Sequence, residues 1–264
     1  VLNELKKSGF DIKFVVTAPD KPRGRNMEVS PTPAKAFGLQ NNIEVFTPIK
    51  ISEQNFIESI KKFNVDVFIV MAYGKIIPEN ILNIPKHGSL NIHPSLLPKF
   101  RGSCPIESAI LSDEKNTGVS IIKMDKEMDH GPIVAIKEVN CEPWPMRRDI
   151  LGTKLVEQGA KLLVEILPSW IKGEIKEKPQ DDSKASYTKK IEKTDGLIDL
   201  KLDPYKNYLK IQAYYGWPSS YFFEKINGKD IRYKITKASF TNGKLIIEKV
   251  IPEGKKEVDY NKQF

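Results

Sequence analysis

Apolar residues in the first two thirds of the chain follow two alternating spacings. Some form short runs, as in strands buried on both faces, and others recur every three to four residues, as on one face of a helix. The predicted strands cover residues 10–16, 43–46, 65–71, 119–124 and 133–136, with another that ends at 90–92, and the predicted helices cover 1–7, 34–39, 52–63, 105–110 and 147–172, the last broken near Pro168. Because helices separate most of the strands, the pattern favours a doubly wound, mostly parallel α/β sheet.

The chain begins inside a predicted helix, with no strand before it. The first strand of a doubly wound sheet is usually central. We therefore expect this strand to be missing, either because the protein is truncated or because its recorded sequence is. Residues 18–33 follow the next strand and contain four prolines, which predicts a loop.

The last third of the chain has a different pattern. A polar segment, 173–190, is interpreted as a linker, and a helix is predicted at 204–214. Short runs rich in aromatic and β-branched residues then follow at 221–223, 231–235 and 245–250, separated by the turn pairs Asn227-Gly228 and Asn242-Gly243. These runs predict a small β-barrel. The predicted division is therefore 1–172, a linker at 173–190, and a barrel domain at 191–264.

Charge is distributed unevenly between these parts. The chain carries 42 Lys and Arg against 34 Asp and Glu, a net charge of +8. Residues 1–182 hold 25 basic and 24 acidic residues, and residues 183–264 hold 17 and 10, so the last third carries +7 of the excess. This asymmetry indicates either a polyanionic partner or a solvated lysine-rich surface. The chain has no apolar run of the ~18 residues that a membrane helix needs and no secretory signal. Its two cysteines, Cys104 and Cys141, are expected to be free thiols, with a disulfide between them as the less favoured alternative.

Residues 88–110 hold the strongest chemical signal. Side chains alternate across a strand, so Asn91 and His93 point away from the apolar Leu90 and Ile92. Two prolines then force a loop at the carboxyl end of the strand, which is where ligands bind in open α/β sheets. An amide can donate to a carbonyl oxygen as it gains charge, and an imidazole can exchange a proton near neutral pH. The pair suits acyl transfer, although a turn-capping Asn and a space-filling His would be the simpler interpretation of Asn-x-His alone.

The stretch Asn-Ile-His-Pro-Ser-Leu-Leu-Pro-Lys-Phe-Arg-Gly, residues 91–102, resembles the signature of the enzymes that move a formyl group from 10-formyltetrahydrofolate to an amine. Within this family, Pro105-Ile106 and Ala109-Ile110 are most similar to the methionyl-tRNA formyltransferases. The resemblance implies a Rossmann-like formyltransferase sheet, an OB-like C-terminal barrel and initiator methionyl-tRNA as the acceptor. It also implies a cytoplasmic enzyme that needs no metal, and nothing in the sequence demands more than a monomer.

The resemblance also implies roles for single residues. Asn91 and His93 would be catalytic, and the match to Met128-Asp129-His130-Gly131 makes Asp129 the carboxylate that orients His93. Asp125 would be structural. His130 is interpreted as a turn residue near the folate rather than as a metal ligand. The predicted folate-binding residues are Tyr73, Gly74, Ser95, Leu96, Leu97 and Pro98, and the predicted tRNA-binding residues are Arg25, Lys225, Lys229, Arg232 and Lys234. Tyr214, Tyr215 and Trp217 are interpreted as barrel core rather than as surfaces that stack on bases.

Two classes of alternative stay open. Enzymes that formylate glycinamide ribonucleotide or an amino sugar share this chemistry, as do formyltetrahydrofolate hydrolases. The glycinamide ribonucleotide enzymes generally end after the catalytic domain, whereas this chain continues into a basic, strand-rich part. A catalytically silent tRNA-binding protein is the alternative from another class, and the presence of Asn91, His93 and Asp129 argues against it.

Overall fold

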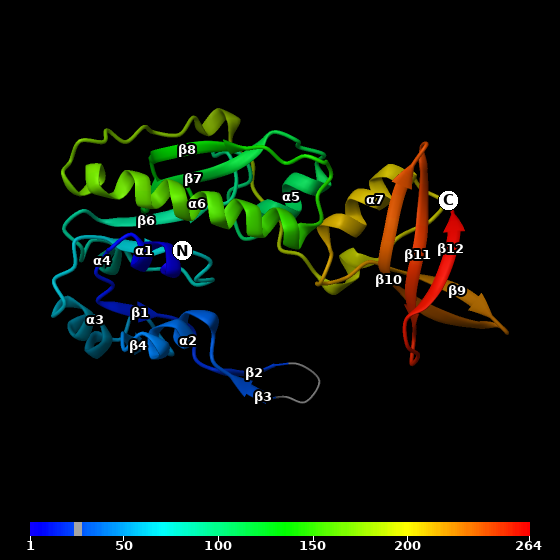
Figure 1. Cartoon of the computed structure of the whole chain (residues 1–264), viewed down its shortest axis with the longest axis horizontal. Helices are drawn as coiled ribbons and strands as arrows, with labels where there is room; N and C mark the ends of the chain where they lie inside the picture. The colour runs from blue at the N-terminus through cyan, green and yellow to red at the C-terminus, as the bar shows by residue number, and fades with distance from the viewer. Residues whose placement is uncertain (24–27) are drawn as a thin grey trace. The chain divides into compact units, whose positions relative to one another are not determined.

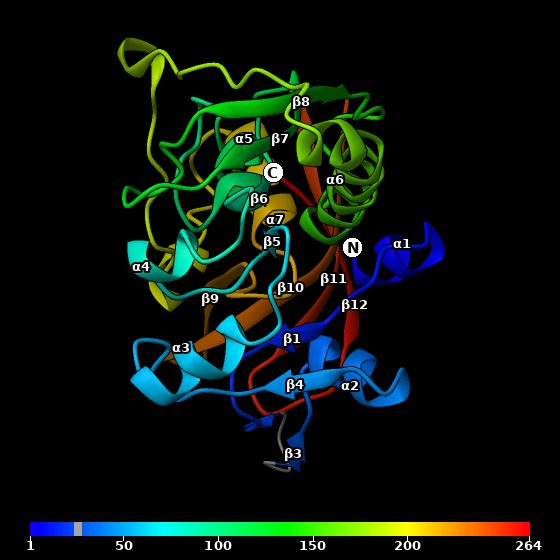
Figure 2. The same cartoon turned by 90° about the vertical axis from the view of Figure 1, so that its left-hand side faces the viewer.

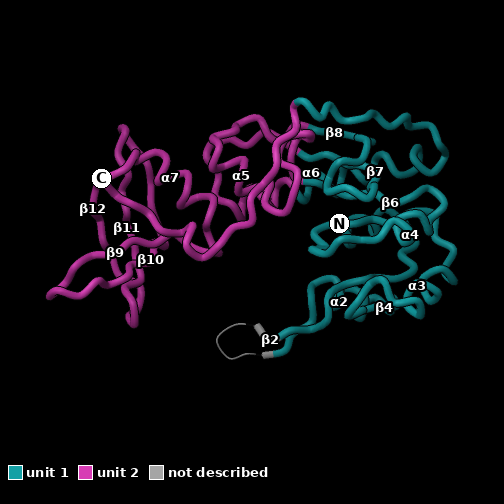
Figure 3. The backbone as a smooth tube through the Cα atoms, turned by 180° about the vertical axis from the view of Figure 1, so that it is seen from behind, with its two compact units in different colours: residues 1–93, 119–137, 156–183 teal, residues 94–118, 138–155, 184–264 magenta. Residues whose placement is uncertain are grey.

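The computed structural model describes residues 1–23 and 28–264, which form two compact units (Figures 1 and 3). Unit 1 contains residues 1–93, 119–137 and 156–183. Unit 2 contains residues 94–118, 138–155 and 184–264. The chain therefore passes between the units five times. The boundaries of these two units differ from those of the predicted domains, 1–172 and 191–264. The domain boundaries therefore stay predictions.

Unit 1 holds the α/β part of the chain. Its elements are α1 (Leu2–Lys7), β1 (Phe14–Val16), β2 (Lys21–Arg23), β3 (Glu28–Ser30), α2 (Pro33–Gln40), β4 (Glu44–Phe46), α3 (Gln54–Lys61), β5 (Phe68–Val70), α4 (Glu79–Leu82) and β6 (Ser89–His93), with most of β7 (Thr117–Lys123), β8 (Ile133–Val139) and α6 (Arg148–Ile171). Strands β1 and β4 pair in parallel. A second sheet has the order β5-β6-β7-β8, in which β5 and β6 are parallel. The β1-β4 and β5-β6 pairs agree with the predicted parallel α/β sheet. Strand β7 runs antiparallel to β6, which was not predicted, because buried apolar runs do not encode strand direction.

The core of unit 1 lies between the second sheet and α6. Figure 2 shows α6 on one side of the sheet that contains β6, β7 and β8. Buried residues of the helix, Leu162, Leu163 and Leu167, pack in one cluster with Leu90 and Ile92 of β6. Each fully buried aliphatic side chain contributes roughly 1.5–3 kcal/mol of transfer free energy. The strand that carries Asn91 and His93 is therefore held firmly on its apolar face.

Three local predictions in unit 1 differ from the structure. The segment predicted as a loop at 18–33 contains the short antiparallel strands β2 and β3. Helix α4 was not predicted, since its four residues are too few to show a period. Helix α6 continues through Pro168. Proline removes one hydrogen bond, but burial of Leu163, Leu167 and Trp170 on either side of it keeps the helix continuous.

Unit 2 begins with α5 (Pro105–Leu111) and ends in an antiparallel sheet. Its later elements are α7 (Pro204–Ala213), β9 (Tyr221–Ile226), β10 (Lys229–Thr241), β11 (Lys244–Pro252) and β12 (Val258–Gln263), with short 3-10 helices at Asp182–Lys184, where the units meet in sequence, and at Lys193–Gly196. The strand order is β12-β11-β10-β9. Both predicted hairpin turns are present, with positive φ at Asn227 and Gly228 (49° and 77°) and at Asn242 and Gly243 (52° and 74°), as type I′ turns require.

The four strands curl, but their pairing does not close a barrel among the described residues. The edge strands β9 and β12 meet through side chains instead. The Lys262 ammonium donates to Glu224 at 2.9 Å, and the Tyr260 hydroxyl donates to the same carboxylate. The rings of Phe222 and Tyr260 are 5.5 Å apart. The structure therefore shows a curled antiparallel sheet, while the OB-like barrel stays a prediction.

Two further predictions concern the whole chain. Within the described ranges, no helix is both long and apolar enough to span a membrane. Cys104 and Cys141 are both free thiols, as predicted.

Candidate active site

Strand β6 presents the first two predicted catalytic residues at its carboxyl end. Asn91 pairs with Val70 of β5 and with Ile122 of β7, and His93 pairs with Ser120 of β7. A strand with neighbours on both sides has little freedom to move, because its backbone groups are bonded on both edges. The His93 side chain is only 4% exposed, so its ring is almost fully removed from water.

The third residue, Asp129, lies in the loop that joins β7 to β8. This loop folds back tightly, with the Lys123 N–H donating to the Pro132 carbonyl at 3.0 Å. A Cβ at Gly131 would come within 1.9 Å of the Lys123 carbonyl oxygen, so only glycine permits this approach. Asp129 itself has φ of 50°, a conformation that costs a residue with a side chain roughly 1–3 kcal/mol. The sequence closes the loop at Gly131, and the closure places Asp129 near β6.

The three side chains meet around the Asp129 carboxylate. The Asn91 amide Nδ2 donates to Oδ1 at 3.2 Å. The second oxygen, Oδ2, lies 3.5 Å from His93 Nδ1, an ion-pair distance slightly longer than a good hydrogen bond. One carboxylate therefore orients both the amide and the imidazole. An amide nitrogen carries two hydrogens, so the bond to Asp129 leaves Asn91 a second N–H for a ligand.

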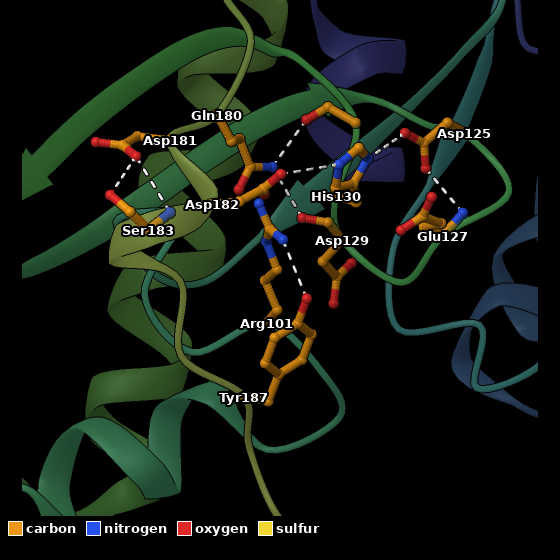
Figure 4. A network of polar contacts seen from close by, with 11 residues as sticks. Arg101, Asp125, Glu127, Asp129, His130, Gln180, Asp181, Asp182, Ser183 and Tyr187 are labelled. Atoms are coloured by element: carbon orange, nitrogen blue, oxygen red, sulfur yellow. Dashed lines mark hydrogen bonds and ion pairs between the residues drawn. The ribbon is translucent and has the colours of Figure 1, made fainter.

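A second group of residues supports this loop, and only Asp125 among them was predicted to be structural. The Gln180 side-chain amide donates to the backbone carbonyls of Asp129 and Gly131, at 2.8 Å each (Figure 4). His130 Nδ1 is 2.7 Å from the Asp125 carboxylate. Gln180 lies in the polar segment 173–190. No periodicity or motif in that segment distinguishes a residue that supports a loop from one on a solvated surface.

Tyr73 and Gly74, predicted to bind folate, lie in the turn after β5. Gly74 has φ of 73°, which suits glycine. The Tyr73 hydroxyl is buried and has no hydrogen-bond partner among the described residues. Burial also raises the pKa of this phenol above its usual value. A buried hydroxyl without a partner is costly, and a bound ligand with a polar edge would satisfy it.

The other predicted folate residues, 95–98, lie in unit 2 in a loop with several internal constraints. The Ser95 hydroxyl donates to the Lys99 carbonyl at 2.7 Å. Arg101, which ends this loop, is 1% exposed and donates to the Tyr187 hydroxyl at 3.1 Å. Gly102 has φ of 114°, and a side chain at this position would clash with Thr188. Residues 186–188 thus fix the end of the loop.

The predicted tRNA-binding residues of the last third lie on the hairpin of β9 and β10. Lys225, Lys229, Arg232 and Lys234 are all exposed, and Arg25 lies outside the described residues. Residues that pair directly across antiparallel strands share a face. Arg232 pairs with Phe223, and Lys234 pairs with Tyr221. Lys225, Arg232 and Lys234 therefore share one face with two aromatic residues, whereas Lys229 has the opposite orientation at the turn.

The interpretation of the nearby aromatic residues as barrel core was wrong. Tyr214 is 6% exposed, but it packs in a cluster with Ile110 and Leu151 rather than in the core of the C-terminal sheet. Trp217 is 55% exposed and Tyr215 is 37% exposed. Tyr215 instead packs under the guanidinium of Arg147, with its ring centroid 3.8 Å from the Arg147 Cζ. Aromatic residues that follow the end of a helix are not fixed to the core by its period.

Helix α6 approaches β6 closely at Gly159, and this contact makes a prediction about the site. A Cβ there would lie 2.6 Å from the Ile92 Cγ2. Gly→Ala in a helix normally stabilises by about 0.5–1 kcal/mol, but overpacking costs about 1–3 kcal/mol, so the clash should dominate. We expect Gly159→Ala to lower the free energy of unfolding, measured with urea, and to reduce kcat because Ile92 lies between Asn91 and His93.

Gly152→Ala is the matched control in the same helix. Its Cβ would meet only the Ile106 Cδ1, at an ordinary 3.4 Å. It should leave kcat unchanged and raise stability by about 0.5–1 kcal/mol. Equal effects of the two substitutions would contradict the importance of the Gly159 contact.

Comparisons with known proteins identify the chain's relatives. A family model described as formyl transferase matches residues 1–167. The methionyl-tRNA formyltransferase of Sulfurihydrogenibium sp. (strain YO3AOP1) is 45% identical over 223 residues, which is 83% of this chain and 71% of that protein. The methionyl-tRNA formyltransferase of Dictyoglomus thermophilum is 39% identical over 275 residues, covering 95% of this chain and 88% of that protein.

Solved structures show the same fold at lower identity. WlaRD, a sugar 3N-formyl transferase studied in the presence of dTDP and 5-N-formyl-THF, superposes with a TM-score of 0.61 at 19% identity, covering 93% of this chain and 88% of that one. Among the described residues, no group of three or more His, Cys, Asp or Glu is arranged to hold a metal ion. The chain belongs to the formyl transferase family, with methionyl-tRNA formyltransferases as its relatives over most of its length.

Proposed function

We propose that this protein transfers the formyl group of 10-formyltetrahydrofolate to the α-amine of initiator methionyl-tRNA, the reaction that prepares the first amino acid of a new chain. The observation that carries the proposal is the contact of one carboxylate, Asp129, with both Asn91 and His93. The identity of 39–45% to methionyl-tRNA formyltransferases supports the choice of acceptor.

The side chains divide the chemistry among them. The neutral amine attacks the formyl carbon, so that a new C–N bond forms and the bond to the folate nitrogen breaks. The free N–H of Asn91 donates to the formyl oxygen as that oxygen gains negative charge. His93 accepts the proton that the amine loses and can return one to the departing nitrogen. Asp129 orients both groups and stabilises the imidazolium that forms.

Binding of the folate is assigned to two segments. Tyr73 and Gly74 are assigned to the folate ring, with the buried Tyr73 hydroxyl as a polar contact. By family resemblance, residues 95–98 are also assigned to the cofactor, which they would contact with backbone and apolar groups. The constraints on this loop at Ser95 and Arg101 support the assignment, because a preformed loop loses little entropy on binding.

Binding of tRNA is assigned to the β9–β10 hairpin. We also propose that the C-terminal sheet, which contains this hairpin, is an OB-like domain. Lys225, Arg232 and Lys234 share one exposed face. Such cations contact phosphates, which gives affinity without sequence readout. Lys229 lies at the adjacent turn, and Arg25 is assigned to the acceptor end of the tRNA by family resemblance.

Replacing Lys225, Arg232 and Lys234 together by Gln should raise KM for methionyl-tRNA and leave kcat nearly unchanged. Each lost phosphate contact should reduce the slope of log affinity against log salt by about 1. Steady-state kinetics at several salt concentrations would measure both effects. The control is Lys255→Gln with Lys256→Gln, two exposed lysines in the β11–β12 turn. An unchanged salt slope in the triple variant would exclude this hairpin as the tRNA contact.

The direct test of the function is to incubate the purified protein with 10-formyltetrahydrofolate and methionyl-tRNA and to detect formylmethionyl-tRNA. Omission of the tRNA identifies a hydrolase, because a hydrolase would still remove the formyl group of 10-formyltetrahydrofolate when no acceptor is present. Replacement of the tRNA by glycinamide ribonucleotide or an amino sugar tests the other acceptors. Tight tRNA binding with no formyl transfer would support the catalytically silent alternative and reject the proposal.

A further inference from the structure

The backbone of Asp129 is in a conformation that needs external support. A residue with a side chain seldom adopts φ of 50° unless its surroundings fix it. Rotation of this residue would turn the carboxylate away from both Asn91 and His93. The groups that hold residues 125–131 in place therefore control whether the carboxylate is available.

The first of these groups comes from a short segment that we call the strap, residues 178–182. The strap is fastened to the start of β8 by two backbone bonds, Ile133 N–H to the Lys178 carbonyl at 2.7 Å and Lys178 N–H to the Ile133 carbonyl at 2.8 Å. From this anchor Gln180 donates to the carbonyls of Asp129 and Gly131. One amide thus holds the backbone on both sides of His130 (Figure 4).

The second group is the His130 ring, which links the loop to the same strap. Its Nδ1 is 2.7 Å from Asp125 Oδ2, and its Nε2 is 3.6 Å from Asp182 Oδ2. Both partners are carboxylates, so the ring satisfies both when each nitrogen carries a proton. Asp125 in turn accepts the Glu127 N–H at 2.9 Å, which fixes the start of the loop.

The electrostatics of His130 agree with this geometry. The hydrogen bond with Asp125 raises the pKa of His130 above its ordinary value. Partial burial opposes the rise, and the charges of Asp125, Glu127 and Asp182 reinforce it. The imidazolium therefore persists to higher pH than a free histidine, and its attraction to the two carboxylates is lost as the pH rises through that raised pKa.

We propose that the strap locks Asp129 in its active orientation, with Gln180 and the imidazolium of His130 as positioning residues. The proposal rests on the proposed function, because it assigns the lock to the same carboxylate. It adds a part of the chain outside the signature, and it makes catalysis depend on an ionisation away from the reacting atoms.

Activity measurements test the Gln180 part of the lock. Gln180→Ala should lower kcat by about 10- to 100-fold, the effect of a misplaced catalytic group, while KM for both substrates stays within about twofold, because the residue is not assigned to either substrate. The control is Ser183→Ala, next to the strap, whose hydroxyl bonds Asp181. An unchanged kcat in Gln180→Ala, with an unchanged melting temperature, would overturn this role.

The pH profile tests His130. His130→Asn removes the cation, so the ratio of wild-type to variant kcat should be largest at low pH and approach 1 as the wild-type ring loses its proton. His130→Arg keeps the charge and should retain more activity than His130→Asn at low pH. A ratio that does not change with pH would mean that the ring only fills space, and would overturn the ionisation part of the proposal.

A third measurement separates this proposal from the proposed function. Amide hydrogen exchange of residues 125–131 needs no substrate, and it should be at least about 10-fold faster in Gln180→Ala than in wild type or Ser183→Ala, as expected when a local opening becomes easier. If exchange is faster in Gln180→Ala but the wild type formylates no acceptor, the role of the strap is supported and the proposed function is rejected. If the wild type formylates methionyl-tRNA normally and exchange in Gln180→Ala is unchanged, the role of the strap is rejected and the proposed function is kept.

Discussion

Replacing Asp129 by Asn should lower kcat for formyl transfer by about 10³- to 10⁴-fold, the size seen when a carboxylate that orients a catalytic histidine is neutralised. Asn keeps the size of the side chain but has one acceptor oxygen and no charge. It cannot serve both Asn91 and His93, whose contacts use the two different oxygens. Single-turnover formylation of methionyl-tRNA measures the chemical step directly.

The control for this substitution is Glu127→Gln, which removes one negative charge from the same loop. The Glu127 contact to Asp125 uses its backbone N–H, so the side-chain change preserves that bond. Its kcat should stay within about threefold of wild type, since exposed charges act weakly at a distance. An Asp129→Asn enzyme with near-normal turnover would remove the basis of the proposed mechanism.

Asn91→Ala should lower kcat by about 10²- to 10³-fold, the cost of removing one donor to an oxygen that gains charge. Affinity for both substrates should change little if the bond strengthens only as the reaction proceeds. The variant should fold normally, because the apolar neighbours Leu90 and Ile92 keep the strand in place. Rapid-quench kinetics with saturating substrates would report the loss.

The double variant of Asn91 and Asp129 gives a sharper test of their contact. Since Asp129 orients the Asn91 amide, removal of the carboxylate should already forfeit part of the benefit of the amide. The double variant should therefore lose less activity than the product of the two single losses. Strictly multiplicative losses would show that the 3.2 Å contact has no catalytic role.

Sequence reasoning found the parts of the site that local chemistry determines. The prolines after His93 predict the loop at the end of β6, and the Asn-Gly pairs predict the hairpin turns that are present. These features depend on one residue type at one position, so a single sequence is enough to show them. The convergence of Asn91, His93 and Asp129 could be expected only from the family signature, because Asp129 lies 36 positions after His93.

Other features depend on partners that a single sequence does not reveal. Gln180 reaches two carbonyls that lie 49 and 51 positions away. Strand β12 has only two apolar residues, Val258 and Tyr260, so its alternation is too weak to predict a strand. The antiparallel direction of β7 and the continuation of α6 past Pro168 are likewise decided by packing in the assembled core.

The interleaving of the two units along the chain affects how the protein is made. Unit 1 gains its last segment, residues 156–183, only after the four earlier stretches of the two units have been synthesised. That segment brings Leu162, Leu163 and Leu167, which cover β6, and it also brings Gln180. A nascent chain on the ribosome would therefore expose the apolar face of β6 until Leu162, Leu163 and Leu167 have emerged. Such a chain depends on chaperones or on rapid late collapse, unlike a protein whose consecutive domains close one after another.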